Sequence, residues 1–158
     1  MSNLREAVCV LTQGSIKGFI LFSEKQNTND ILVTLNLQNV PPGKHGFHIH
    51  TSGDLREGCN SLCSHFNPYN SIHGGRNDRI RHVGDLGNIE SNQSGIVREK
   101  FYDKRIKLRG INNIIGRSVV IHEDEDDLGR GCDNESLKTG NAGKRIACGV
   151  IGYSKKSC

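Results

Sequence analysis

Short segments in which apolar residues occupy every second position recur along this 158-residue chain. Between residues 31 and 38, this spacing is followed by Ile31, Val33, Leu35 and Leu37. Successive side chains of a β-strand point to opposite faces, so the spacing predicts a strand with one buried and one solvated face. Further strand-like segments, separated by turn signals, are predicted at 4–11, 16–22, 45–50, 84–90, 96–102, 117–122 and 145–153.

Two long segments interrupt this pattern, from residue 51 to about 82 and from about 123 to 144. No segment shows a long period of 3.6 residues, so helices are not expected. About eight short strands are typical of an all-β fold, either an immunoglobulin-like sandwich or an eight-stranded Greek-key β-barrel. Long irregular segments are uncommon in so compact a chain, and they usually have a function. We therefore expect one domain over residues 1–158 with two long functional loops.

Composition narrows the compartment and the partners. The first ten residues include Arg5 and Glu6 and lack an apolar run long enough for a signal peptide or a membrane span, so we expect a cytoplasmic protein. The net charge is +4, but basic residues are interleaved with acidic ones, apart from the cluster GRNDRIRH at 75–82. We therefore expect neither nucleic acid nor membrane as a partner. A reducing compartment disfavours disulfides among the six cysteines, and there is no C-x-x-C motif.

The histidines are the residues most suggestive of chemistry. His48 and His50 lie two apart on a predicted strand and therefore share a face. Such a pair alone is weak evidence, because solvated surface histidines reach this spacing by chance. Other histidines, however, lie in or beside the two loops, where sites are usually built. Imidazole suits copper and zinc, and an added carboxylate suits zinc. The further candidate ligands are His65, His73, His82, Asp85 and His122.

Six blocks of sequence carry a resemblance to a known family: HGFHIH, GCNSLCSHFNP, IHGG, RHVGDLGN, VVIHEDEDDLGRG and KTGNAGKRIACGVIG. With their spacing, and from residue 7 to residue 152, they resemble a eukaryotic-type, intracellular copper/zinc superoxide dismutase. The resemblance implies a Greek-key β-barrel, a homodimer, and one copper ion and one zinc ion per subunit. It also implies an enzyme that disproportionates two superoxide anions to dioxygen and hydrogen peroxide by alternating reduction and reoxidation of copper, while zinc structures the site.

The resemblance also assigns ligands and catalytic residues. The copper ligands would be His48, His50, His65 and His122. The zinc ligands would be His65, His73, His82 and Asp85, so that His65 bridges the two ions. His65 and Arg145 would be catalytic, the first carrying a proton and the second positioning the anion. His45 matches a structural position.

Supporting residues follow from the same resemblance. Asp126 would link His48 to His73 and fix both rings. Glu135 and Lys138 would lie on the rim of the substrate channel. Asn134 stands where many relatives have an acid, so we expect a more positive rim and a rate that falls with added salt.

The disulfide implied by the resemblance joins Cys59 to Cys148. Cys63 lies four residues from Cys59 and could compete for that bond. Cys9 matches a buried family thiol, and no role follows for Cys132 or Cys158.

Other departures affect the partners. Ser52 replaces an aromatic residue of the family's dimer interface, and Tyr153 lies near another interface position, yet NNIIGR and GVIG keep the remaining surface. Neither Lys144 nor Ile146 is a proline, which predicts copper loading without the family's chaperone. The main alternative function is a protein of the same fold that sequesters copper or zinc without catalysis. An electron-transfer blue-copper site is disfavoured because the only methionine is Met1.

Overall fold

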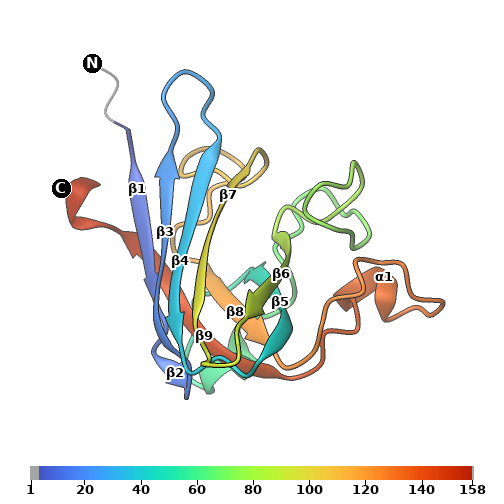
Figure 1. The fold of residues 1–158 in the computed structure, drawn as a ribbon. Helices are drawn as coiled ribbons and strands as arrows, with labels where there is room; N and C mark the ends of the chain where they lie inside the picture. Colours follow the sequence, from blue (N-terminus) through green and yellow to red (C-terminus); the bar gives the residue numbers. More distant parts are fainter. Residues whose placement is uncertain (1–3, 158) are drawn as a thin grey trace.

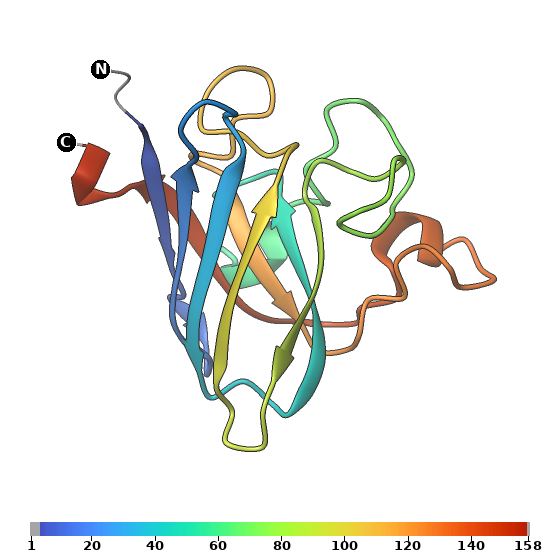
Figure 2. The same ribbon diagram turned by 45° about the horizontal axis from the view of Figure 1, so that its top comes forward.

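The computed structural model describes residues 4–157 and shows an almost entirely β architecture (Figures 1 and 2). The strands are β1 (Glu6–Val10), β2 (Gln13–Gly14), β3 (Lys17–Glu24), β4 (Ile31–Gln38), β5 (Gly43–His50), β6 (Asp85–Ser91), β7 (Val97–Asp103), β8 (Ser118–His122) and β9 (Arg145–Tyr153). The helical turns are η1 (Gly58–Ser61), α1 (Ser136–Thr139) and η2 (Lys155–Ser157).

All strand pairs are antiparallel, in the order β6-β5-β8-β9-β1-β3-β4-β7, and the two-residue β2 adds to β9. This order forms a nearly closed barrel of eight main strands, so the predicted fold is confirmed. The two-residue β2 and the short helical turns were not predicted, because segments of two to four residues leave no periodic signal. Whether residues 1–158 form one domain stays a prediction.

The alternating apolar side chains of β4 lie inside the barrel. Ile31, Val33, Leu35 and Leu37 are each no more than 1% exposed. They belong to a cluster that gathers buried side chains from both halves of the barrel. In contrast, β8 is buried along its whole length, and Leu62, from the loop that follows β5, packs against Val120 of this strand.

Two long loops, 51–84 and 123–144, leave the barrel on the same side (Figures 1 and 2). The backbone N–H of His73 donates to Leu137 O at 2.8 Å, which joins the two loops directly. Among the described residues, no helix is long and apolar enough to span a membrane.

Candidate metal centre

One group of four buried histidines contains the predicted pair on β5. Its ligand atoms all lie within 4.8 Å of one another. The Nε2 atoms of His50 and His122 face each other at 3.4 Å. The residues are His48, His50, His65 and His122, from β5, the first loop and the end of β8.

A second group surrounds Asp85, the first residue of β6. Its Oδ1 lies 2.8 Å from His65 Nδ1, 2.9 Å from His73 Nδ1 and 3.1 Å from His82 Nδ1. Burial alone would raise the pKa of Asp85, but its contacts with these histidines hold it well below its usual value. His65 belongs to both groups, so one imidazole ring can present a nitrogen to each.

Asp126 joins the two groups from the side of the second loop. Its Oδ2 lies 2.7 Å from His48 Nε2 and its Oδ1 lies 2.8 Å from His73 Nε2. The Asn88 side chain clamps the Asp126 backbone, accepting from its N–H at 2.7 Å and donating to its carbonyl at 2.9 Å. The sequence did not predict a role for Asn88. The one available signal was that asparagine is uncommon inside a β-strand, and Asn88 lies in a predicted strand.

The chemistry of these residues fits two metal ions. His48 Nδ1 is buried without a hydrogen-bond partner, and a buried polar atom of this kind requires an explanation. Burial, followed by neighbouring histidines, lowers the pKa of His48 and His50 well below 6.5. Burial also lowers the pKa of His122 to about 4. Metals bind the neutral form of imidazole. The four imidazoles of the first group form a donor set that suits copper.

The second group favours positive charge. Burial lowers the pKa of His73, but hydrogen bonds with Asp126 and Asp85 outweigh it and raise the pKa to about 9. The carboxylates that favour a proton here also favour a bound cation. Three imidazoles and one carboxylate match the four-coordinate sites that zinc prefers.

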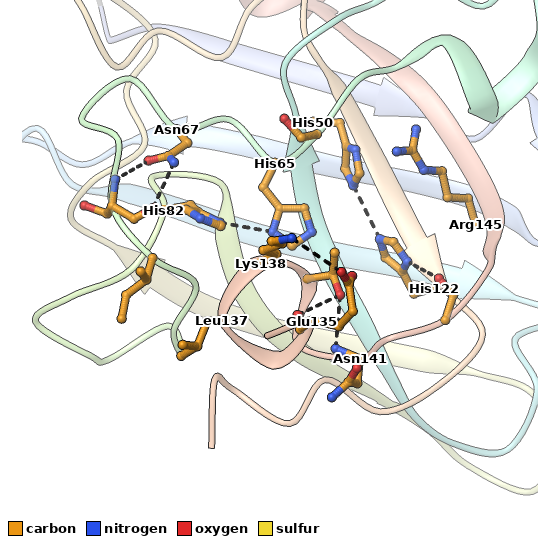
Figure 3. A pocket seen from close by; sticks show the side chains of 15 residues that line it. His50, His65, Asn67, His82, His122, Glu135, Leu137, Lys138, Asn141 and Arg145 are labelled. Atoms are coloured by element: carbon orange, nitrogen blue, oxygen red, sulfur yellow. Dashed lines mark hydrogen bonds and ion pairs between the residues drawn. The ribbon is translucent and has the colours of Figure 1, made fainter. Parts of the chain in front are cut away.

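A cavity of about 770 Å³ gives access to both groups (Figure 3). Arg145 lies on the side of His50 and His122, and its guanidinium donates to Cys59 O at 2.7 Å and Cys63 O at 2.6 Å. Glu135 and Lys138 also line the cavity, and their side chains form an exposed ion pair at 3.7 Å. The structure thus brings the predicted metal ligands, Arg145, Glu135 and Lys138 to this cavity or to the two ligand groups behind it.

The predicted disulfide is present between Cys59 and Cys148, while Cys63 and Cys132 are exposed free thiols and Cys9 is buried. Cys158 lies outside the described residues. His45 takes no part in either group, because its nitrogens lie 2.9 Å from His122 O and 2.8 Å from Pro41 O.

Comparison with known proteins decides the family. Residues 16–151 match the family described as copper/zinc superoxide dismutase (SODC). The chain belongs to this family. A Cu-Zn superoxide dismutase of Paramecium bursaria Chlorella virus 1 is 52% identical over 152 residues, which cover 96% of this chain and 80% of that protein. Superoxide dismutase A of Xenopus laevis is 52% identical over 149 residues, covering 94% of this chain and 97% of that protein.

An extracellular superoxide dismutase of Drosophila melanogaster is 51% identical over 137 residues, covering 87% of this chain and 76% of that protein. A crystal structure of the clock protein EA4 has a TM-score of 0.92 at 45% identity and covers 98% of both chains. The protein is therefore a copper/zinc superoxide dismutase with copper and zinc as its cofactors. A viral relative and an extracellular relative are 52% and 51% identical to this chain, so family membership leaves the intracellular type open.

Proposed function

We propose that the four histidines of the first group bind copper and that His65, His73, His82 and Asp85 bind zinc. The observation that carries this assignment is the position of His65 in both groups. Copper supplies the electron acceptor and donor for superoxide, whereas zinc is redox-inert and supplies a fixed charge.

His65 and Arg145 act on the substrate. Arg145 binds the anion through the N–H groups that its two carbonyl partners leave free, and its charge is permanent. His65 lines the cavity while its Nδ1 faces Asp85, so its Nε2 can hold a proton and pass it to the reduced anion. A second proton from solvent completes hydrogen peroxide. Asp126 keeps the rings of His48 and His73 oriented throughout.

Metal content measured together with turnover tests this assignment. The protein should hold about one copper and one zinc per chain, because each of the two groups offers the donor set of one of these ions. Removal of copper should abolish superoxide turnover, and His65→Ala should disturb both sites. A protein that holds both metals without turnover would instead be the sequestering alternative.

We also propose a homodimer. Val150 is 37% exposed and Tyr153 is 57% exposed, both on β9. A Cβ at Gly53 would lie 3.4 Å from Val150 Cγ1, so the segment that contains Ser52 adjoins this surface. An apolar surface of this kind favours association. Sedimentation should give twice the chain mass of 17.4 kDa, and a single 17.4 kDa species at micromolar concentration would contradict it.

We also propose that the protein is of the eukaryotic intracellular type and lies in the cytoplasm, because two of its cysteines are exposed free thiols. Cys63 and Cys132 are free and exposed, which is unusual in oxidising compartments. Cell fractionation tests the location. We further propose that copper loading does not require a chaperone, since neither residue beside Arg145 is a proline. Absence of activity in a chaperone-deficient host would contradict this.

A further inference from the structure

The barrel has one seam without backbone pairing, between β6 and β7, within residues 4–157. Strand edges expose carbonyl groups that need partners, and residues two apart on a strand point their carbonyls to the same side. At this seam the partner is a side chain from the first loop. Arg76 Nε donates to Leu86 O at 2.8 Å, and Arg76 Nη2 donates to Asn88 O at 3.2 Å.

Arg76 also contacts the opposite strand. Its guanidinium carbon lies 3.4 Å from the centre of the Phe101 ring on β7, a stacked cation–π contact. The side chain is half-buried, and burial lowers the pKa of Arg76. The guanidinium therefore fills the place of a missing strand pair, with β6 on one side and β7 on the other.

A second arginine of the cluster at 75–82 fastens the backbone at the same point. Arg81 donates to the Arg76 carbonyl and pairs with Asp103 at the end of β7 at 2.8 Å, and it is only 2% exposed. Two of the three arginines in this basic cluster, Arg76 and Arg81, therefore point into the seam. Arg81 is tolerated there because two carbonyls and a carboxylate pair with its two terminal nitrogens.

The strand that Arg76 holds carries residues of the metal centre. Asp85 begins β6, and Asn88 clamps the backbone of Asp126. His73 precedes Arg76 by three residues, and His82 follows Arg81. Groups fixed before a ligand arrives lose less entropy when it binds.

We propose that Arg76 is a positioning residue for the zinc ligands, holding the first loop against β6 so that their geometry exists before the metal binds. The proposal rests on the ligand assignment above. Arg76→Ala should weaken zinc binding about tenfold, at the lower end of the effect of outer residues on metal sites. Arg76→Lys should restore it only in part, because an ammonium cannot reproduce the two-carbonyl fork.

Zinc affinity is measured by competition with a chromophoric chelator, and the unfolding free energy is measured on the metal-free protein. Arg98→Ala is the matched control, because Arg98 on β7 donates to Leu37 O and Val97 O but holds no part of the first loop. It should leave zinc affinity within about twofold of the parent, since it has no link to the ligands. A role confined to the seam would lower stability without a selective effect on zinc.

Parent-level zinc affinity in Arg76→Ala or Arg76→Lys, or an equal loss in Arg98→Ala, would overturn the proposal. His82→Ala separates this failure from failure of the ligand assignment. If His82→Ala keeps zinc, the assignment is wrong. If it loses zinc while Arg76→Ala does not, the positioning role is wrong.

Discussion

Gly140 lies directly against Asp126. A Cβ on residue 140 would collide with Asp126 Oδ1, the oxygen that His73 Nε2 contacts. Gly140 also ends α1 with φ +69°, a left-handed conformation that favours glycine. The Asp126 bridge between the two groups therefore requires a residue without a side chain at position 140.

Gly140→Ala should therefore displace Asp126 and lower zinc affinity about tenfold or more, as expected when an outer partner of a metal ligand moves. Gly110→Ala is the control, because Gly110 has φ +74° with open space around it. Both variants carry the same backbone strain, but only the first meets the carboxylate. Chelator competition checks the affinities, and equal losses in both variants would show that strain alone is responsible.

Asp126→Asn tests the carboxylate itself. An amide can accept from only one of the two histidines through its oxygen, and it carries no charge to favour a cation. Metal affinity should fall about 10- to 100-fold, most strongly at the zinc group that contains His73. Glu125→Gln, at an exposed neighbour paired with Lys44, should change nothing at the metals. Unchanged metal content in Asp126→Asn would contradict the bridging role.

The sequence predicts those features of the metal centre that follow a regular spacing along the chain. Alternation located the strands, and histidines at strand ends and in long loops indicated the metal ligands. Gly140 and Asn88 could not be predicted, because their roles depend on contacts with Asp126, which lies 14 residues from Gly140 and 38 residues from Asn88. The inward orientation of Arg76 could not be predicted either, because a basic cluster in the sequence does not show which of its side chains pack between two strands.

Cys59→Ser should affect both stability and substrate binding. The disulfide closes a sequence separation of 89 residues, and loss of such a bond lowers the unfolding free energy by about 2–4 kcal/mol. The Cys59 carbonyl also holds Arg145, so the rate with superoxide should fall. Thermal unfolding and stopped-flow kinetics check the two effects. Cys132→Ser, at an exposed free thiol, is the control and should match the parent in both.

The charge of Arg145 should be visible in the salt dependence of the rate. Electrostatic steering predicts that kcat/KM of the parent falls as ionic strength rises. Arg145→Ala should lower kcat/KM at low salt by about tenfold or more and flatten its salt dependence. Lys17→Ala removes an exposed cation outside the cavity lining and should keep the parental slope. A parental rate indifferent to salt would contradict steering.

Acid should weaken the barrel through Glu24. Burial alone would raise the pKa of this carboxyl, but hydrogen bonds from Arg109 and the Arg5 backbone lower it below 4.5. A carboxyl whose pKa is lower in the folded state stabilises the protein above its unfolded pKa, and this contribution is lost as pH falls through the folded value.

Glu24→Gln should therefore lower the unfolding free energy of the metal-free protein by about 1 kcal/mol at pH 7, the size of a typical hydrogen-bond contribution. The difference from the parent should shrink as the pH falls below 4.5, because the parent then loses the same charge. Urea unfolding across this range measures it, with the exposed Glu57→Gln as control. A difference that stays constant down to pH 3 would mean that Glu24 stabilises the barrel by packing, because its charge would then contribute nothing measurable.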